Sequence, residues 1–455
     1  MTRKYDHIRA NAIVALNQIL NQDKFSNDVI NDIFSKNNFP DLDKRFMVAL
    51  IYGTLEQLPI LDYWINELSH IEFQKIDDFV LLILRMSFWQ IEFSEKIPPS
   101  AAINEAVKLT KYFHKNQYSG YVNAILRESL RNPIKLPKKR EHLKYGLSAE
   151  MFGLYKKWFG ETKAKHILEN SSPKDLTVLL LDNNYNEWLK SLEEKGIKYK
   201  PGHLIQDAYQ IVDFSENVSK LPGFAEGKIY IQDESSMLPS KTIHLFKNRE
   251  NQSIKMLDAC AGLGGKSISF INEDPTLDIT ALEPNQKRFN GLNENIKRLN
   301  LKQIEAKNID LQTFSLQNKD GNKFDFILLD VPCSGLGIIR HKPEIKIKMN
   351  YQKIQEFPKL QFELLQEAAK LVNENGILCY STCTINPDEN QNLIQKFLET
   401  KSGKQFMKLN MEKLLPYIKE EGRPILKEYI FDSDIQIYPS HYNLDGFYIS
   451  CLKKR

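Results

Sequence analysis

Apolar side chains recur at helical spacing through the first part of the chain. Residues 9–20, RANAIVALNQIL, and residues 101–109, AAINEAVKL, place apolar side chains three or four positions apart, on one face of a helix. Pro-Pro-Ser at residues 98–100 is a typical start signal for the second of these helices. We therefore predict an all-helical bundle over residues 1–132, which is either a scaffold and partner surface or an RNA-binding domain.

The helical pattern ends in a basic, proline-containing stretch, RNPIKLPKKR at residues 131–140. Prolines, charge and the loss of periodicity together predict a linker, which we place at residues 133–144. A solvated connector is the simpler interpretation. The alternative is that Lys138, Lys139 and Arg140 contact the phosphates of a nucleic acid.

Residues 145–240 mix helical and extended patterns. Residues 147–170 are amphipathic and are expected to be helical. Two strands, at residues 176–181 and 210–214, are predicted on either side of a helix at residues 188–195. This region therefore predicts a small α+β module.

From residue 241 to residue 455 the pattern changes to alternating strands and helices. The predicted strands are residues 254–257, 280–282, 324–329 and 376–380, and the predicted helices start near residue 266 and cover residues 286–299 and 356–372. Apolar strands without polar alternation are typical of a doubly wound parallel sheet, which helices cover on both faces. A further apolar segment, residues 446–452, is predicted to close the edge of this sheet.

Composition narrows the class of protein. The chain has 455 residues, 42% of them hydrophobic, and a net charge of +4, which is compatible with nucleic acid but weak evidence for it. Its start does not read as a signal peptide, and its longest apolar runs are far too short to span a membrane. Five cysteines, an odd number, argue against a disulfide framework and favour the cytoplasm. No CxxC pair or histidine cluster has zinc spacing, so no metal is expected.

A glycine-rich turn follows the first predicted strand of the last domain, with the sequence DACAGLGGK at residues 258–266. Such turns bring the backbone close to NAD, FAD or S-adenosylmethionine alike, and the spacing is not that of a P-loop. Glu283 follows Gly264 by about 20 residues and ends the second strand, where an acid binds ribose hydroxyls. Asp310 ends the next segment and could contact adenine, although either acid could also be a helix cap or part of a surface turn. Their placement at successive strand ends favours a bound adenosine.

Two thiols lie just past two other predicted strand ends. Residues 326–330 form an apolar run that ends at Asp330, and the turn that follows presents Cys333, while Cys383 follows the strand at 376–380. Methylation of a pyrimidine at C5 needs such a set, because a thiolate must add to C6 before C5 becomes nucleophilic, and the C5 proton must then leave. An acid at the position of Asp330 would hold the ring near N3 and O2. This chemistry does not decide which thiol attacks.

The other three cysteines have simpler interpretations. Cys379 lies inside a strand and Cys451 in the terminal strand, so both are expected to be small buried residues. Cys260 is expected to be a loop residue that touches the cofactor. A dehydrogenase would leave Cys333 and Cys383 without a role.

Together these motifs resemble the RNA cytosine-C5 methyltransferases of the bacterial RsmB (Fmu/Sun) type and their NOP2/NSUN relatives. The resemblance rests on the glycine-rich turn, DVPCSG at residues 330–335, STCT at 381–384 with Glu389-Asn390 after it, GIIRHKPEI at 337–345, IQDESS at 231–236 and DGFY at 445–448. Three N-terminal segments, LIYGTL at 50–55, AINEAV at 102–107 and VNAILR at 122–127, are similar to the NusB-type RNA-binding bundle.

The resemblance implies a multidomain chain: a NusB-like bundle at 1–132, an RRM-like module within 145–240, and a Rossmann-like methyltransferase domain at 241–455. It implies 16S ribosomal RNA as substrate, and S-adenosylmethionine as cofactor. Cys383 would be the C6 nucleophile, Cys333 would assist release, and Lys266 would lie near the cofactor and the base. The cofactor contacts would be Cys260, Ala261, Gly262, Leu263, Gly264, Gly265, Lys266, Glu283, Asp310 and Asp330.

The chain departs from the family pattern at three places. Gly262-Leu263 replaces the usual Ala-Pro, Glu56 stands where a basic residue is common, and His341 replaces the second of two arginines. Arg340 and His341 are the RNA contacts that we predict in this segment. The alternatives are a tRNA cytosine-C5 methyltransferase and a non-catalytic NusB-like RNA-binding factor. We expect a monomer, with no membrane and no metal partner.

Overall fold

The computed structural model describes residues 6–171, 175–182, 184–214, 216–246, 254–318 and 321–455. The chain forms two compact units: Met1–Ala164 with Ile339–Tyr351, and Lys165–Ile338 with Gln352–Arg455. The first five residues of the predicted N-terminal bundle lie outside the described residues. No helix in the described ranges is both long and apolar enough to cross a membrane.

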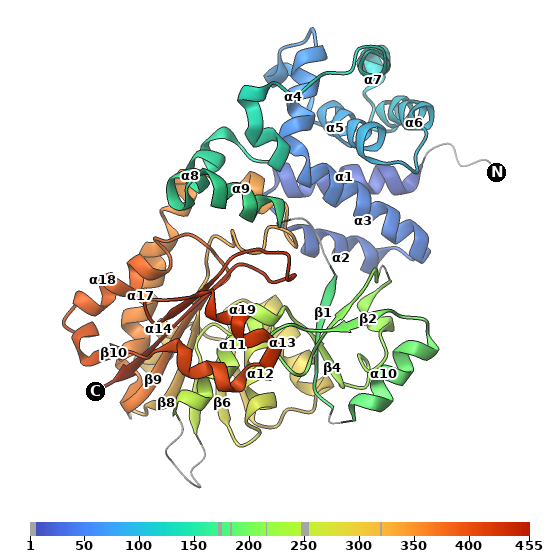
Figure 1. Cartoon of the computed structure of the whole chain (residues 1–455). Coiled ribbons are helices and arrows are strands. Elements are labelled where there is room, and N and C mark those ends of the chain that lie inside the picture. Colours follow the sequence, from blue (N-terminus) through green and yellow to red (C-terminus); the bar gives the residue numbers. More distant parts are fainter. Residues whose placement is uncertain (1–5, 172–174, 183, 215, 247–253, 319–320) are drawn as a thin grey trace. The chain divides into compact units, whose positions relative to one another are not determined.

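The first unit is helical, as predicted for residues 1–132 (Figure 1). Its helices are α1 (His7–Asn21), α2 (Ser26–Lys36), α3 (Asp41–Glu56), α4 (Leu58–Leu68), α5 (Asp78–Phe93), α6 (Pro99–Tyr112), α7 (Ser119–Arg131), α8 (Ala149–Phe159) and α15 (Ile345–Lys348). Short 3₁₀ turns η1 (Phe73–Lys75) and η2 (Asn116–Tyr118) connect some of them. Two more helices, α9 (Glu161–Glu169) and α16 (Tyr351–Ile354), span the divisions between the units.

Helix α5 is the centre of this bundle. The Asp77 side chain caps its start by accepting hydrogen bonds from the backbone N–H groups of Phe79 and Val80. Contacts with α1, α3, α4, α6 and α7 surround the helix. Leu82, Ile83 and Leu84 are consequently all fully buried, although they point in different directions. A helix packed on all sides needs apolar residues all round, which explains the run FVLLIL at residues 79–84.

The segment Ile339–Tyr351, which follows the turn that carries Cys333, packs into this helical unit, which the sequence did not predict. The Glu344 carboxylate is fully buried, and its Oε1 accepts hydrogen bonds from Ser26 N (3.0 Å) and Ser26 Oγ (2.7 Å). Lys346 Nζ donates to the carbonyl oxygen of Tyr145 at 3.0 Å, and burial lowers the pKa of this lysine. Polar bonds between buried groups therefore fix this segment to the bundle.

The predicted linker contains a 3₁₀ helix, η3 (Lys138–Tyr145). Lys138 and Lys139 are exposed on it, and the Arg140 guanidinium lies over the Tyr63 ring, 4.7 Å from its centroid. Helix α8 packs against η3 within the first unit, so the division between the units does not coincide with the predicted boundary at residue 145.

A small α+β module opens the second unit, as predicted. Its antiparallel sheet has the strand order β2-β3-β1-β4. The elements are β1 (Leu176–Leu180), α10 (Tyr185–Glu194), β2 (Tyr199–Pro201), β3 (Ala208–Ile211) and β4 (Ile229–Ile231). Trp188 and Leu192 of α10 pack on Val178 and Leu180 of the central strand β1. Its likeness to an RRM remains a prediction.

The rest of the second unit is a large sheet with the order β11-β12-β13-β9-β8-β5-β6-β7, and β10 pairs with β13. Its strands are β5 (Lys255–Asp258), β6 (Asp278–Leu282), β7 (Ile304–Lys307), β8 (Phe324–Asp330), β9 (Val372–Thr382), β10 (Phe406–Lys408), β11 (Ile430–Phe431), β12 (Asp434–Ile437) and β13 (Phe447–Lys454). Its helices are α11 (Glu234–Lys241), α12 (Gly265–Glu273), α13 (Gln286–Arg298), α14 (Leu311–Gln317), α17 (Phe357–Lys370), α18 (Gln391–Glu399) and α19 (Arg423–Lys427).

The parallel part of this sheet, from β9 to β7, is covered by helices on both faces (Figure 1). Phe326 and Leu328 of β8 belong to the core that also contains residues of α11, α12 and α13. Ile327 and Leu329 belong to the opposite core, with residues of α14, α17 and α18. Because side chains alternate between the faces, a strand buried on both sides must be apolar throughout, which confirms the doubly wound prediction for these strands.

The prediction for the last strand is wrong in one respect. β13 does not close the edge of the sheet, because it pairs with β9 on one side and with β12 on the other. All pairings beyond β9 are antiparallel, so the sheet is mixed rather than wholly parallel. The connections between β11, β12 and β13 contain no crossover helix, and short connections of this kind join antiparallel strands.

The Ser26–Glu344 contact gives a stability prediction. Ser26→Ala removes the hydroxyl that donates to a buried carboxylate, so we expect the free energy of unfolding to fall by about 1.5–3 kcal/mol. Ser35→Ala is the control, because the Ser35 hydroxyl donates to a backbone carbonyl at an exposed position. The control should change stability by about 0.5 kcal/mol or less, as measured by urea denaturation. Equal effects of both substitutions would contradict the assigned role of Glu344.

Candidate active site

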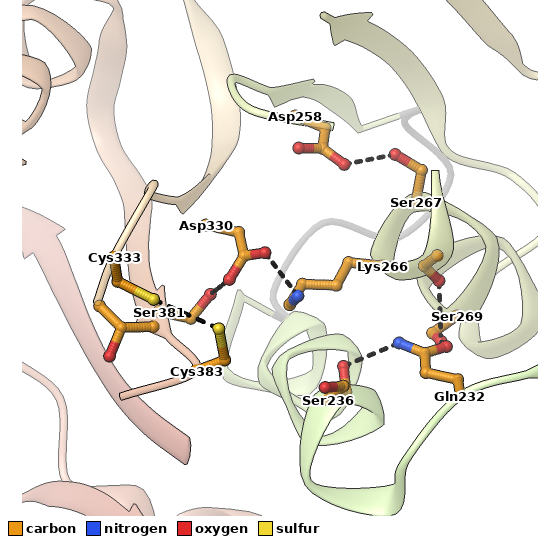
Figure 2. Close-up of polar contacts among 12 residues, drawn as sticks. Gln232, Ser236, Asp258, Lys266, Ser267, Ser269, Asp330, Cys333, Ser381 and Cys383 are labelled. Carbon is orange, nitrogen blue, oxygen red and sulfur yellow. Dashed lines mark hydrogen bonds and ion pairs between the residues drawn. The ribbon is translucent and has the colours of Figure 1, made fainter. Parts of the chain in front are cut away.

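The carboxyl ends of β8 and β9 lie side by side, because Asp330 is in register with Ser381. The Ser381 hydroxyl donates to Asp330 Oδ1 at 2.8 Å. Lys266, in the first turn of α12, donates from Nζ to Asp330 Oδ2 at 2.5 Å (Figure 2). The strand-end carboxylate is thus held from both sides, by a hydroxyl and by an ammonium group.

Both predicted thiols meet at this edge of the sheet. The Sγ atoms of Cys333 and Cys383 are 3.2 Å apart, and both side chains are half-buried (Figure 2). The hydrogen bond to the Cys383 sulfur, together with burial and nearby negative charge, raises the pKa of Cys333 well above its ordinary value. Two thiolates this close would repel each other strongly, so one of the two sulfurs keeps its proton.

Lys266 supplies positive charge beside the thiols. Burial lowers the pKa of Lys266, but the Asp330 carboxylate and the negative charge available at Cys383 outweigh burial, so the pKa lies above its usual value. The ammonium also lies 5.2 Å from the centroid of the Phe447 ring. A permanently charged lysine therefore borders the Cys383 side of the pair.

The glycine-rich turn between β5 and α12 has the predicted backbone. Gly262 (φ +57°) and Gly264 (φ +86°) are both left-handed, and Gly264 is the N-cap of α12. Open space surrounds the position where Gly262 would carry a side chain, and Leu263 beside it is exposed. Ala261 N donates to the carbonyl oxygen of Leu282, which ties the turn to the end of β6. Cys260 in this turn stays a thiol, because burial and the Asp258 carboxylate raise its pKa.

Two further acids lie at the ends of the neighbouring strands. Glu283, after β6, is buried, and its Oε1 accepts a hydrogen bond from Asn285 N at 2.7 Å. Asp310, after β7, is exposed and caps α14 by accepting from Thr313 N at 2.7 Å. The helix-cap interpretation of Asp310 is therefore confirmed, and its role towards adenine remains a prediction.

Asp258 at the end of β5 is a buried acid. Its Oδ2 accepts a hydrogen bond from Ser267 Oγ at 2.6 Å, while Oδ1 has no partner among the described residues (Figure 2). Burial raises the pKa of Asp258 to about 6, and the Ser267 hydrogen bond opposes this rise. At neutral pH this buried carboxyl group is ionised, and its ionisation lowers the stability of the folded protein.

The remaining cysteines have the environments that the sequence predicted. Cys379 of β9 and Cys451 of β13 are fully buried and face each other in register. The predicted RNA contacts belong to the first unit, where Arg340 is buried and His341 is exposed. Their role and that of Lys138, Lys139 and Arg140 remain predictions.

The structure also adds residues that the sequence did not single out for a role. Ser381 directly precedes the Thr-Cys-Thr segment, and Ser334 and Glu389 lie within or just after the cysteine motifs. Gln361, in contrast, is far from both motifs in the sequence. The position of Ser381, Ser334 and Glu389 in or beside the motifs was the sequence signal that could have identified them. Gln361, on α17, has no motif signal, and only the fold brings it to the site.

The chain matches two known protein families. Residues 243–453 match the family described as 16S rRNA methyltransferase RsmB/F, and residues 6–131 match the NusB family. The "Probable ribosomal RNA small subunit methyltransferase B" of Bacillus subtilis (strain 168) is 30% identical, over 99% of this chain and 100% of its own length. The chain belongs to the RsmB/F methyltransferase family. It is an S-adenosylmethionine-dependent RNA cytosine-C5 methyltransferase.

Another relative has a similar name, and two solved structures share the fold. The "Ribosomal RNA small subunit methyltransferase B" of Salmonella arizonae is 30% identical over 87% of this chain and 91% of its own. The fold is similar to that of PH0851, with a TM-score of 0.79, 22% identity and 98% of each chain covered. It is also similar to NSun6 from Pyrococcus horikoshii, solved with SFG, an analogue of S-adenosylmethionine, with a TM-score of 0.56 and 18% identity. That match covers 68% of the RsmB/F chain and 98% of the other.

The residues at the strand ends fit S-adenosylmethionine. The open space at Gly262 lets a ligand approach the backbone of the turn. Glu283 Oε2 makes no hydrogen bond within the described ranges, so it is available to ribose hydroxyls. The exposed Asp310 carboxylate at the next strand end is available to the adenine amino group. These residues would hold the cofactor, which would supply a methyl group when bound.

The raised pKa of Asp258 predicts a pH-dependent stability. The folded protein binds this proton more tightly than the unfolded chain, so ionisation costs stability as the pH rises from about 4 to about 6. Asp258→Asn removes that cost and should be up to about 3 kcal/mol more stable than the wild type at neutral pH, with little difference near pH 4. Asp278→Asn, which replaces an exposed carboxylate of β6, should show no such dependence in urea denaturation. A constant difference across this pH range would refute the assignment.

Proposed function

We propose that this RsmB/F enzyme methylates C5 of a cytosine in 16S ribosomal RNA through a covalent bond between Cys383 and C6 of the base. The observation that carries the proposal is the 3.2 Å pairing of Cys383 with Cys333, beside Lys266 and Asp330. C5 chemistry needs a nucleophile that adds to C6 and a base that removes the proton from the adjacent atom C5. A pair of thiols in contact meets this requirement, and it has no use in hydride transfer.

Charge supports Cys383 as the attacking sulfur. Lys266 interacts electrostatically with Cys383, and an ammonium group favours a thiolate over a thiol. The raised pKa of Cys333 keeps the proton on that sulfur. The thiolate of Cys383 then adds to C6, and the electron pair moves into the ring, where C5 becomes nucleophilic.

Methyl transfer and release complete the cycle. S-adenosylmethionine supplies a methyl group on a sulfonium centre, and C5 then carries both this methyl group and its original proton. Once Cys383 is bonded to carbon it bears no negative charge, so the part of the rise in the pKa of Cys333 that comes from Cys383 disappears. Cys333 loses its proton to solvent and takes the C5 proton. The C6–Sγ bond breaks as the C5–C6 double bond re-forms, and Cys383 leaves as a thiolate.

Asp330 and Lys266 bind the polar edge of the base, whereas the two thiols react at its carbon atoms C6 and C5. Asp330 accepts hydrogen bonds at both oxygens, so it can act as an acceptor for N–H groups at the N3 edge of the base. Lys266 stabilises negative charge that develops on the ring oxygen O2 during the adduct. A base inside a duplex cannot reach these groups, so the cytosine is flipped out or lies in an open loop.

The substrate proposal rests on the relatives. Those of Bacillus subtilis and Salmonella arizonae are named as ribosomal RNA small subunit methyltransferases, and the first matches along the whole chain. The NusB match over residues 6–131 supports an RNA-binding role for the helical bundle. A tRNA substrate is the same-chemistry alternative.

A substrate assay tests this proposal. The protein is incubated with isotope-labelled S-adenosylmethionine and either unmodified 16S ribosomal RNA or unmodified tRNA, and 5-methylcytosine is mapped in the products. We expect label at cytosine C5 in the ribosomal RNA and background levels in tRNA. Transfer to tRNA alone would overturn the ribosomal substrate, and no transfer to either RNA would overturn the proposed function.

The two thiols have opposite predicted phenotypes. Cys383→Ala should abolish both turnover and the covalent complex, because no sulfur adds to C6. Cys333→Ala should abolish turnover but accumulate a protein–RNA complex that survives denaturing electrophoresis, because the C5 proton is not removed. Cys451→Ala, in a buried thiol outside the site, is the control and should keep both turnover and release. Exchanged phenotypes would reverse the two roles.

A further inference from the structure

Glu389 is a fully buried carboxylate between the two thiol-bearing turns, and the mechanism above does not use it. Its Oε2 accepts hydrogen bonds from Ser334 N (2.9 Å) and Gln361 Nε2 (2.8 Å). Its Oε1 accepts from Asn386 Nδ2 (2.9 Å) and Ser334 Oγ (2.5 Å). Two carboxylate oxygens therefore hold four hydrogen bonds in a site from which water is excluded.

These bonds connect Glu389 to both thiols. Ser334 directly follows Cys333, and its hydroxyl also lies 2.7 Å from Oγ1 of Thr384, the residue after Cys383. Gln361 Nε2 also donates to the carbonyl oxygen of Pro332, the residue before Cys333, at 2.9 Å. The Cys333 turn is thus held on both sides of the thiol by groups that bind Glu389.

The pattern of donors indicates the charge of Glu389. Both partners of Oε2, Ser334 N and Gln361 Nε2, are N–H donors, so a carboxyl proton on Oε2 would face only donors. On Oε1, Asn386 Nδ2 is also a donor, and only the Ser334 hydroxyl could accept a proton. Burial raises the pKa of Glu389, and these hydrogen bonds oppose the rise. The site is therefore built for a carboxylate.

We propose that Glu389 decides which of the two thiols is the nucleophile. It is a positioning residue that holds the Cys333 turn against Cys383, and its negative charge keeps the shared proton on Cys333. The thiolate is left on Cys383, next to Lys266. This inference rests on the proposed function, because it assigns a direction to the same pair of sulfurs.

The charges around the two thiols differ: negative groups act on Cys333, and a positive group acts on Cys383. The groups that act on Cys333 are Cys383, Glu389 and Asp330, all of which disfavour a second negative charge there, and the neutral phenol of Tyr380 lies nearby. Lys266 interacts with Cys383 on the opposite side of the pair. Hydrogen bonding and charge therefore both favour the proton on Cys333 and the thiolate on Cys383.

Two substitutions test the charge of Glu389. Glu389→Gln keeps the shape of the side chain and removes the charge, whereas Glu389→Asp keeps the charge on a shorter side chain. Purified full-length protein without RNA is treated with iodoacetamide over a range of pH, and mass spectrometry measures the alkylation rate at each cysteine. Because no RNA or cofactor is present, the result does not depend on whether the substrate proposal holds.

In the wild type we expect Cys383 to react first near neutral pH and Cys333 only at higher pH. Glu389→Gln should raise the ratio of Cys333 to Cys383 alkylation at neutral pH by about tenfold, which corresponds to a fall of one unit in the pKa of Cys333. Glu389→Asp should leave the ratio near that of the wild type.

Asp325→Asn is the matched control, because it removes one partly buried charge at the opposite end of β8 and should not change the ratio. An unchanged ratio in Glu389→Gln, or an equal shift in Glu389→Asp, would overturn the role of the charge. If Glu389→Gln does not fold, the wild-type profile still decides: faster alkylation of Cys333 than of Cys383 near neutral pH would overturn the inference. Loss of RNA methylation with the expected alkylation pattern would instead overturn the proposed function alone.

Discussion

The whole site depends on the parallel pairing of β8 with β9, which places two strand ends next to each other. The register of Asp330 with Ser381 brings the two following turns together, and with them the sulfurs of Cys333 and Cys383 to 3.2 Å. A shift by one residue would turn every side chain of a strand to the other face of the sheet. Because both strands are buried on both faces, apolar packing fixes this register, and the geometry of the two thiols follows from it.

Buried carboxylates organise the structure around this contact. Glu389 is stabilised by four hydrogen bonds, Glu344 by two from Ser26, and Asp258 by one from Ser267. A buried charge is costly unless it is hydrogen-bonded, so each acid holds its donors firmly in place. Glu389 holds two loops together and Glu344 anchors a segment, while burial raises the pKa of Asp258 to about 6.

The chain between the catalytic turn and the helical unit is short. Gly335 ends the turn, and Ile339 already belongs to the compact unit that contains the NusB-type helices. The Ser26–Glu344 bond fixes the far side of this connection within that unit. The helical unit is therefore joined to the catalytic turn through the backbone, and removal of residues 1–132 would leave the Glu344 charge without its partner.

The sequence by itself determined the elements and the chemistry. Helical spacing predicted the N-terminal bundle, uninterrupted apolar runs predicted the doubly wound strands, and thiols and acids at strand ends predicted methyl transfer to a base. These properties are local, because periodicity and turn chemistry act over a few residues. The antiparallel extension beyond β9, the packing of Ile339–Tyr351 into the helical unit, and the contacts of Glu389 and Gln361 with the thiol turns were decided only by tertiary structure. They join residues that are far apart in the chain, and no local pattern records which distant partner a buried polar group will find.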